Sequence, residues 1–563
     1  MGDRSPTADL GRDRSRLRGR LSWAGLLVLL ALASVVPASA SESSGAVAWG
    51  VNTDGQLGND TTTTEKEAVA VKVLTEATAV AAGELHSLAL LKSGKVMAWG
   101  ANTDGQLGIG STTKEKEPVE VKGLTEVVAV AAGGGHSLAL LKSGKVMAWG
   151  DNADGQLGNG TTTKEKEPVE VKGLTEVVGI AAGADHSLAV LKNGKVMAWG
   201  DNADGQLGNG TTTTEKEPVE VTGLSEAAAV AGGELHSLAL LKSGKVMAWG
   251  DNADGQLGNG TTTTEKEAVE VKGLSEVAGV AAGYSHSLAL LKSGKVMAWG
   301  DNADGQLGNG TTTTEKEAVE VKGLSEAAAV AGGELHSLAL LKSGKLMAWG
   351  DNADGQLGNG TTTTKEEPVE VTGLSHMGAI AAGANFGLSS YATLPANTEA
   401  PAISGEAKDE KTLSATTGTW SGSPPITYSY QWESCNTAGE ACTSISGATS
   451  ASYTVAHEEV GHTIRVKVTA TNAAGEASAS SAQTATVLPS LSVGELQHGR
   501  RRLREHLGGD QLDLHDRPRR GRAHDPGQGD RQKQRRRSRR HLVPDGDCPA
   551  LGTREHRPAG GLG

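Results

Sequence analysis

The fifty residues AVAAGELHSLALLKSGKVMAWGANTDGQLGIGSTTKEKEPVEVKGLTEVV (Ala79–Val128) are one unit of a repeat that runs through most of this 563-residue chain. The tryptophan of the unit returns every 50 residues, without an insertion, at Trp49, Trp99, Trp149, Trp199, Trp249, Trp299 and Trp349. Repeats of this length are typical of solenoids and propellers, in which neighbouring units bury a shared core.

Each unit reads as four short β-strands. The segment HSLALLKSGKVMAWG consists of two apolar runs around Lys-Ser-Gly-Lys, and one unit has Asn193-Gly194 at that turn. Asn-Gly readily adopts the positive backbone angles of a tight hairpin. VAVAAG (Val128–Gly133) and PVEVKGL (Pro118–Leu124) supply two further β-type runs. Four strands per unit predict the blade of a β-propeller.

The two ends of the array predict how it is completed. GAVAWG (Gly45–Gly50) is a strand with no preceding partner, and IAAGANFGLSSYATLP (Ile380–Pro395) lacks the strand that should follow. Together the two fragments make one blade. We therefore predict an all-β, seven-bladed propeller over residues 45–394, closed by pairing of its first and last strands so that no sheet edge stays exposed.

The order HSLAL…G.V.AWG.N..GQLG.G resembles the regulator of chromosome condensation repeat family, over about Gly45–Leu394. The resemblance implies a seven-bladed propeller. The last unit departs from the pattern, because Phe386 stands in the histidine position and Gly387 replaces the serine.

The loop DNADGQLGNGTTTTEKE (Asp201–Glu217) is acidic and rich in glycine. Asp201 and Asp204 lie three apart, which is the wrong register for a helix-loop-helix calcium site. GQLGNG leads into no helix, so it does not match a phosphate-binding loop. Asn and Asp cap turns with their side chains and glycine supplies positive backbone angles. We predict a structural turn with no metal and no cofactor.

A histidine recurs in six units, at His86, His136, His186, His236, His286 and His336. A metal site needs several ligands within a few ångströms, but a propeller places one of these residues in each blade. We predict buried imidazoles that are hydrogen-bonded within their own blades. The chain has no nucleophile elbow, no His-Glu-x-x-His motif and no paired-carboxylate signature, so we predict that it is not an enzyme.

The N-terminal segment 1–40 has the pattern of an export signal. Arginines precede the apolar run LSWAGLLVLLALASVV (Leu21–Val36), and Ala38–Ala40 is a small-residue cleavage motif. The run is short for a membrane-spanning helix, which needs about 20 residues. We predict cleavage after Ala40 and a secreted or cell-surface protein with no stable membrane span; the alternative is a retained anchor.

Residues 395–490 alternate polar and apolar side chains and are rich in Thr, Val and Tyr. This pattern predicts a small β-sandwich, and it resembles the immunoglobulin-like modules of bacterial surface and secreted proteins. Cys435 and Cys442 lie seven apart. After export they are expected to form a local disulfide, the alternative being two free thiols. We interpret the module as a spacer or an adhesion module.

The whole chain has a net charge of −13, but the tail 491–563 differs in composition from the rest. Arginine is abundant from Arg500 onward, whereas Arg465 is the only arginine between Ser41 and Gly499. Arginine clusters suggest nucleic-acid binding, but export and the lack of stacking aromatics argue against it. Read one nucleotide downstream, the tail can encode a near-copy of Thr463–Val487. We favour a frameshifted second immunoglobulin-like module, which as translated should be disordered.

Positions that differ between near-identical units are candidates for partner binding, and the alternative is neutral drift at solvated positions. The pair before the histidine position varies most, and a pair at that place belongs to a loop at one end of each blade. We predict a partner-binding rim on one face of the propeller. Its candidate residues are Glu84, Leu85, Asp185, Glu234, Leu235, Tyr284, Glu334 and Leu335.

We predict a monomeric, exported, non-enzymatic propeller that binds a protein partner, and the carboxylates favour a basic one. One alternative is an inhibitor of a secreted enzyme, such as the β-lactamase-inhibitory propeller that shares this repeat. A less favoured alternative is guanine-nucleotide exchange on a small GTPase, because the strict spacing leaves no inserted wedge.

Overall fold

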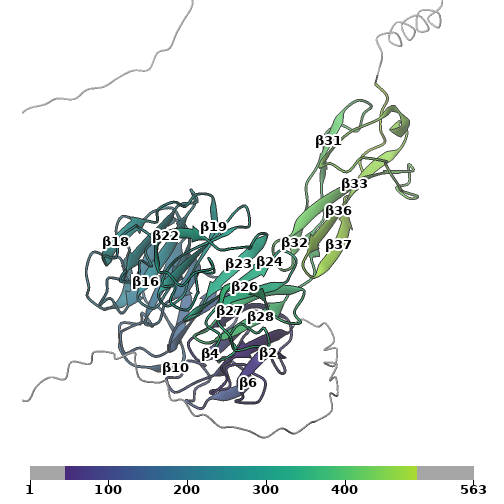
Figure 1. Ribbon diagram of the computed structural model, residues 1–563. Helices are drawn as coiled ribbons and strands as arrows, with labels where there is room; N and C mark the ends of the chain where they lie inside the picture. Colours follow the sequence, from purple (N-terminus) through teal and green to yellow (C-terminus); the bar gives the residue numbers. More distant parts are fainter. Residues whose placement is uncertain (1–44, 491–563) are drawn as a thin grey trace, which may run out of the picture. The chain divides into compact units, whose positions relative to one another are not determined.

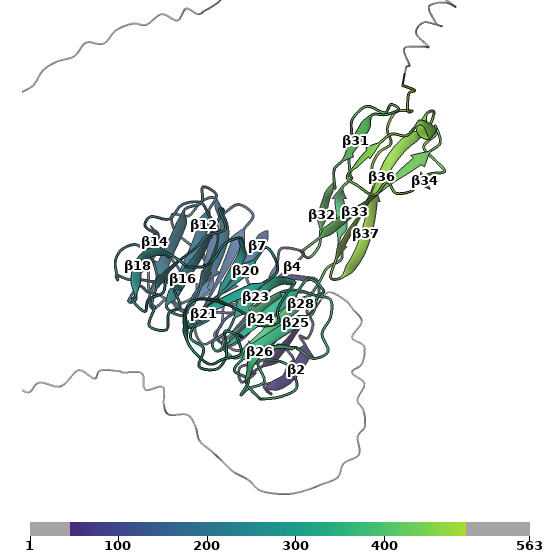
Figure 2. The same cartoon turned by 45° about the horizontal axis from the view of Figure 1, so that its top comes forward.

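Seven four-stranded antiparallel sheets make up the repeat region of the computed structural model, which describes residues 45–490. The sheets lie side by side in both views of the ribbon (Figures 1 and 2). One edge strand of each sheet contacts the corresponding edge strand of the next sheet, in the order β3, β7, β11, β15, β19, β23 and β27. β27 in turn contacts β3, so each of the seven sheets has a neighbour on both sides. The architecture is all-β and consistent with a propeller of seven blades.

Six sheets are formed by consecutive strands. The first three are β3 (Ala77–Ala82), β4 (His86–Leu91), β5 (Val96–Gly100) and β6 (Glu115–Glu120); β7 (Val127–Ala132), β8 (His136–Leu141), β9 (Val146–Gly150) and β10 (Glu165–Glu170); and β11 (Val177–Ala182), β12 (His186–Leu191), β13 (Val196–Gly200) and β14 (Glu215–Glu220). The next three are β15 (Ala227–Gly232), β16 (His236–Leu241), β17 (Val246–Gly250) and β18 (Glu265–Glu270); β19 (Val277–Ala282), β20 (His286–Leu291), β21 (Val296–Gly300) and β22 (Glu315–Glu320); and β23 (Ala327–Gly332), β24 (His336–Leu341), β25 (Leu346–Gly350) and β26 (Lys365–Glu370).

The seventh sheet, called the composite sheet below, joins the two ends of the repeat region. It consists of β2 (Glu65–Ala70), β1 (Ala46–Gly50), β28 (Phe386–Tyr391) and β27 (Met377–Ala382), in that order. β1 pairs with β28 from Ala46 opposite Ser390 to Gly50 opposite Phe386. The pairing of the first strand with the last is the one that the sequence predicts.

The turn chemistry read from the sequence explains the central hairpins of the six sheets that are formed by consecutive strands. Gly194 has φ +83°, a left-handed conformation that glycine adopts without steric cost. The side-chain oxygen of Asn193 accepts a hydrogen bond from the amide of Lys195 at 3.0 Å. These two residues therefore fix the tight connection between β12 and β13.

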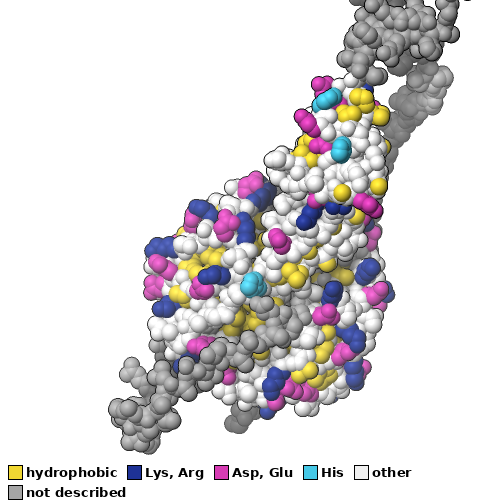
Figure 3. Space-filling view, turned by 90° about the vertical axis from the view of Figure 1, so that its right-hand side faces the viewer, with side chains coloured by type: hydrophobic (Ala, Val, Ile, Leu, Met, Phe, Trp, Pro, Cys, Tyr) yellow, Lys and Arg dark blue, Asp and Glu magenta, His cyan; other side chains and the backbone are white. Residues whose placement is uncertain are grey.

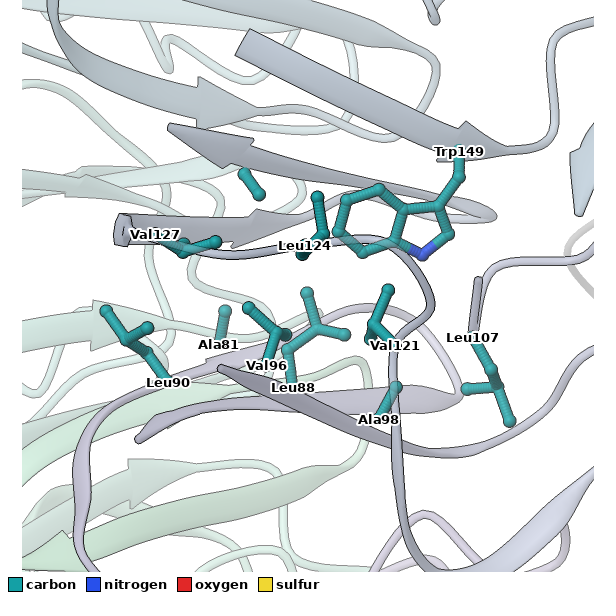
Figure 4. Close-up of a cluster of buried hydrophobic side chains, with 11 residues drawn as sticks. Ala81, Leu88, Leu90, Val96, Ala98, Leu107, Val121, Leu124, Val127 and Trp149 are labelled. Atoms are coloured by element: carbon teal, nitrogen blue, oxygen red, sulfur yellow. The ribbon is translucent and has the colours of Figure 1, made fainter. Parts of the chain in front are cut away.

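Tryptophan fills the space between adjacent sheets. The indole of Trp149, on β9, packs against Leu88 and Val96 of the preceding sheet (Figure 4). Its Nε1 donates a hydrogen bond to the backbone oxygen of Gln106 at 2.8 Å. All seven repeat tryptophans are fully buried. Replacing such a buried tryptophan by alanine lowers the free energy of unfolding by about 3–5 kcal/mol. The tryptophans therefore contribute strongly to the packing between sheets.

The outer strands carry charged side chains at their first three positions. Six of these strands begin Glu-Lys-Glu, and β26 begins Lys-Glu-Glu. Ion pairs such as Lys95–Glu120, at 2.9 Å, link the outer strands to the neighbouring strand. Figure 3 shows acidic and basic side chains interspersed over one side of the molecule. Charged outer strands discourage edge-to-edge pairing with other chains.

Residues 396–490 form three small antiparallel sheets with a core of their own. The core includes Leu413, Trp432, Ile464, Val466 and Val468. Cys435 and Cys442 form the predicted local disulfide. The elements are β29 (Ala396–Glu399), β30 (Ile403–Ser404), β31 (Thr412–Ala415), β32 (Thr419–Ser421), β33 (Thr427–Cys435), β34 (Thr443–Ser444), β35 (Ser452–Thr454), the 3-10 helix η1 (His457–Glu459), β36 (Thr463–Asn472) and β37 (Gly475–Ser480).

The predicted export signal, 1–40, and the arginine-rich tail, 491–563, lie outside the described residues. Within residues 45–490, no helix has the length and apolar character needed to cross a membrane.

Candidate functional site

The loops that join the first and second strands of the sheets meet around one cavity. Each loop begins with a glycine, the first being Gly83 between β3 and β4. A Cβ atom on Gly83 would collide with the imidazole of His86 and with the backbone oxygen of Gly133 in the next sheet. The absence of a side chain therefore lets neighbouring loops approach one another closely.

The residue after each glycine is called a rim residue below, and six of the seven rim residues, all except Glu334, line this cavity. The rim residues are Glu84, Gly134, Ala184, Glu234, Tyr284, Glu334 and Ala384. Backbone hydrogen bonds tie several of them to the next sheet, as from the Glu234 amide to the Tyr284 oxygen at 3.2 Å. The cavity has a volume of about 70 Å³. Among its lining residues only Glu84, Glu234 and Tyr284 have side chains larger than a methyl group.

Carboxylates from four sheets act electrostatically on the phenol of Tyr284. Burial raises the pKa of Tyr284, and the negative charges of Glu84, Glu334, Glu234 and Asp185 raise it further. Burial also raises the pKa of Glu84, with a smaller contribution from the charge of Glu234. The cavity mouth is thus an acidic surface around a single aromatic ring.

The predicted partner-binding residues divide into two groups. The structure brings Glu84, Glu234 and Tyr284 together at the cavity, with the charge of Glu334 close by. The leucines of the prediction do not line the cavity. They are half-buried, and their backbone oxygens accept hydrogen bonds at 2.9 Å from the chain that follows the third strand. These leucines are Leu85, Leu235 and Leu335.

Asp185 stands apart from the cavity lining, among other aspartates. Its carboxylate accepts a hydrogen bond from the Gln156 side chain at 3.3 Å. Burial raises the pKa of Asp185 to about 6, and the charges of Asp154, Asp151, Asp201 and Glu84 add to this effect. The three loop aspartates are not among the partner-binding residues predicted from the sequence. Their recurrence at fixed positions of the unit was the signal that could have found them.

The glycine-rich loop itself is held by its own side chains. Asn202 donates to the backbone oxygen of Thr213 at 2.9 Å and accepts from the amide of Leu207 at 3.0 Å. Gln206 accepts from the amide of Asp204 at 3.0 Å and donates to Asp201 at 2.8 Å. These bonds give the asparagine, glutamine and first aspartate of the loop a structural role.

The negative charge of these loops is unevenly compensated around the molecule. Lys114 pairs with Asp54 at 3.3 Å, and Lys164 pairs with Asp104 and with Asp151. The equivalent position in the next unit is Thr214. Burial and neighbouring aspartates raise the pKa of Asp204. One sector of the face is therefore more acidic than the sector that carries the two lysines.

The repeat histidines correct one prediction. Each of five imidazoles bonds to a serine in the next sheet, instead of to a group in its own blade; the Nε2 of His86, for example, lies 2.9 Å from the Oγ of Ser137. That hydroxyl donates to the backbone oxygen of Gln106, so it accepts from the imidazole. The other pairs are His136–Ser187, His186–Ser237, His236–Ser287 and His286–Ser337.

All six histidines are fully buried. Burial lowers the pKa to about 3 for His86, His186 and His286, and to about 4 for His136, His236 and His336. These imidazoles are therefore neutral at physiological pH. They stabilise the boundary between sheets, and none of them lines the cavity.

The described residues contain no group of three or more His, Cys, Asp or Glu side chains that could hold a metal ion. The chemistry that the cavity mouth offers is recognition: carboxylates for a cation and an aromatic face for stacking or apolar contact.

Comparisons with known proteins point to one family. The family model described as the RCC1-like domain matches residues 36–326. Two models of the regulator of chromosome condensation (RCC1) repeat match residues 327–356 and 343–389. The comparison with curated proteins found no match.

Solved structures share the fold at low sequence identity. Human WBSCR16 has a TM-score of 0.56 and 24% identity, covering 62% of this chain and 99% of its own. Yeast RCC1 (Prp20) bound to Kap60 has a TM-score of 0.55 and 22% identity, covering 66% of this chain and 96% of its own. Prp20p from Saccharomyces cerevisiae has a TM-score of 0.54 and 24% identity, covering 62% and 92%. The family model covers more than half of the sequence, and the chain belongs to the RCC1-like domain family.

Proposed function

We propose that this chain is an exported, non-enzymatic propeller that binds a basic protein partner with the acidic mouth of its central cavity. The observation that carries the proposal is that Glu84, Glu234 and Tyr284 line one cavity. The negative charges of Glu334 and Asp185 add to the electrostatic effect on Tyr284. A lysine or arginine of a partner would relieve the repulsion between these carboxylates, and Tyr284 would supply the aromatic contact.

The fold supports a protein partner. RCC1-like propellers are a protein-binding fold, and one structural neighbour, Prp20p, is described together with its binding to Gsp1p and histones. For this chain the partner is proposed from the charge of the cavity mouth. Binding should weaken as salt concentration rises, because charge attraction between exposed groups is screened within about 10 Å at 0.1 M ionic strength.

The remaining parts of the chain fit an exported protein. We propose that residues 1–40 direct export, that residues 395–490 are an immunoglobulin-like spacer and that pairing of β1 with β28 closes the propeller. We also propose that the tail encodes a second such module in another reading frame.

The export proposal predicts the mass of the mature protein. Expression of the gene in a bacterium that exports it should yield a protein whose first residue is Ser41, since cleavage is expected after Ala40. Intact-mass measurement of the exported protein checks both ends at once. A mass that retains residues 1–40 would contradict cleavage, and a mass that includes the arginine-rich tail would contradict the frameshift.

The binding site predicts which substitutions weaken a partner recovered by pull-down. Tyr284→Ala should cost about 2 kcal/mol of binding free energy, a loss of about 30-fold in affinity, as is common for an aromatic residue at an interface centre. Glu234→Gln should cost less and should reduce the salt dependence. Affinity is measured by titration calorimetry at two salt concentrations.

The matched control is Glu217→Gln, which removes the same charge from an exposed position of the outer strand β14. It should leave affinity unchanged. If Tyr284→Ala, Glu234→Gln and Glu334→Gln all bind like the parent protein, the cavity mouth is not the binding site. A nucleotide-exchange assay on a small GTPase distinguishes the remaining alternative, because the proposed binder should not accelerate exchange.

A further inference from the structure

We propose that two copies of this chain exchange β1 and β2, so that each composite sheet is completed by the N-terminal strands of the other copy. The partner is a second copy of this chain, and the interface is the pairing of β1 with β28. Three independent features of the composite sheet lead to this inference.

The first feature is the way in which the composite sheet is assembled. β1 and β28 lie at opposite ends of the repeat region and pair over five residues, from Ala46–Ser390 to Gly50–Phe386. Trp49 is fully buried and donates to the backbone oxygen of Gln356 at 2.9 Å. Every one of these contacts can be made by β1 of another copy, because no short connection ties β1 to β28. Such exchange of an identical element is a low-cost route to dimers.

The second feature is the absence of the imidazole–hydroxyl link on both sides of the composite sheet. On one side Gly387 replaces the serine, and neither ring nitrogen of His336 has a hydrogen-bond partner. On the other side Phe386 replaces the histidine that would donate to Ser87. The five histidine–serine links lie at the other five boundaries between sheets. Among the seven sheets of residues 45–394, the composite sheet is therefore the one that has this link at neither boundary.

The third feature is backbone strain in the connection between β2 and β3. Val73 lies in this connection with φ +56°, and its side chain is exposed. The equivalent residue of the following units is glycine, as at Gly123 with φ +69°. A β-branched residue is strained in the left-handed region, whereas glycine is not. Val73 marks the hinge about which β1 and β2 would move, and an extended hinge would relieve its strain.

Together these features place a strained hinge beside the sheet that is assembled from the two ends of the repeat region and lacks the imidazole–hydroxyl link at both boundaries. Exchange keeps the pairing of β1 with β28 and the burial of Trp49, and it releases the strain at Val73. The monomer expected from the sequence and the exchanged dimer would interconvert with protein concentration, since only the dimer requires a second copy.

A disulfide trap tests the exchange directly on the full chain. Ala46 and Ser390 are buried and directly opposite each other, so Ala46→Cys with Ser390→Cys suits a disulfide between adjacent strands. Cys548→Ser removes the remaining cysteine. After oxidation at low concentration the link should form within one chain. At high concentration a covalent dimer should appear on a non-reducing gel. The proposal would be overturned if light scattering shows only monomers. It would also be overturned if dimers form but the engineered disulfide always joins positions 46 and 390 of the same chain.

Two variants test the origin of the exchange. Val73→Gly removes the strain and should lower the share of dimer about fivefold. Phe386→His places a donor opposite Ser87 and should lower it as well. The matched control is Gly123→Val, which introduces the same strain where a Cβ meets nothing within 4 Å, in a connection that does not lead to the composite sheet. Gly123→Val should leave the share of dimer unchanged. If it raises the share of dimer by as much as Val73→Gly lowers it, strain at Val73 is not specific to the exchange and the hinge is refuted.

Discussion

At pH 5 the repeat region is expected to have lost about 10 kcal/mol of its free energy of unfolding relative to pH 7. The reason is the set of six buried histidines, whose pKa values are lowered by burial to about 3 or 4. In the unfolded chain these imidazoles regain a pKa of about 6.5. Circular dichroism as a function of pH, with urea titrations at each pH, measures the loss.

The sign follows from which state binds protons. Between about pH 6.5 and pH 4 the unfolded chain takes up protons that the folded chain excludes, so stability falls as pH falls. Each imidazole contributes about 2 kcal/mol between pH 7 and pH 5, and the sum for six is comparable with a typical total stability of about 5–15 kcal/mol. Four carboxyl groups whose pKa is raised act in the opposite direction, namely Glu84, Asp154, Asp185 and Asp204. Acid unfolding is therefore expected near pH 5.

Two matched substitutions separate the charge of the imidazole from its hydrogen bond. His336 has no hydrogen-bond partner, and Phe386 shows that phenylalanine fits the equivalent buried position. His336→Phe should raise the free energy of unfolding at pH 7. It should also lower by one the number of protons that the chain takes up when it unfolds in acid. His236→Phe removes the same proton but also the bond to Ser287, which costs about 1 kcal/mol. An acid transition that is unchanged in both variants would show that these histidines do not govern it.

The sequence predicted the strands because each unit repeats strong local signals. Asn193-Gly194 marks a hairpin, and the apolar runs on either side become β12 and β13. The composite sheet followed from the two incomplete ends of the array, and Cys435 with Cys442 followed from their spacing. These predictions depend on neighbours in sequence, or on the rule that sheet edges are to be paired.

The contacts between sheets were not predictable in the same way. In every histidine-containing unit the histidine is followed directly by a serine, so the sequence alone does not show that His86 bonds to Ser137 and not within its own blade. The rim posed a similar problem. Of two adjacent loop residues one faces the cavity, as Glu84 does, and the other faces away, as Leu85 does. Which one it is depends on how closely Gly83 packs against the next sheet.

A chain that begins at Val51 is expected to lose the cooperative fold of the repeat region. The truncation removes β1, and with it the buried side chains of Ala46, Val47, Ala48 and Trp49. Loss of the tryptophan alone costs about 3–5 kcal/mol. β28 and β2 would both lose their central partner, which exposes two strand edges to pairing with other chains. Scanning calorimetry and light scattering should show a broadened transition at lower temperature, together with aggregation.

The matched control is a chain that begins at Gly45, which keeps β1 and lacks only the residues before it. It should unfold in one cooperative transition like the parent protein. A synthetic peptide spanning Gly45–Gly50, added to the Val51 chain, should restore part of the stability, because β28 recognises β1 through backbone pairing and the pocket of Trp49. If the Val51 chain melts like the Gly45 chain, β1 does not hold the ring together. In that case the β1–β28 exchange would also lose its driving force, since the exchanged dimer is stabilised by the same strand.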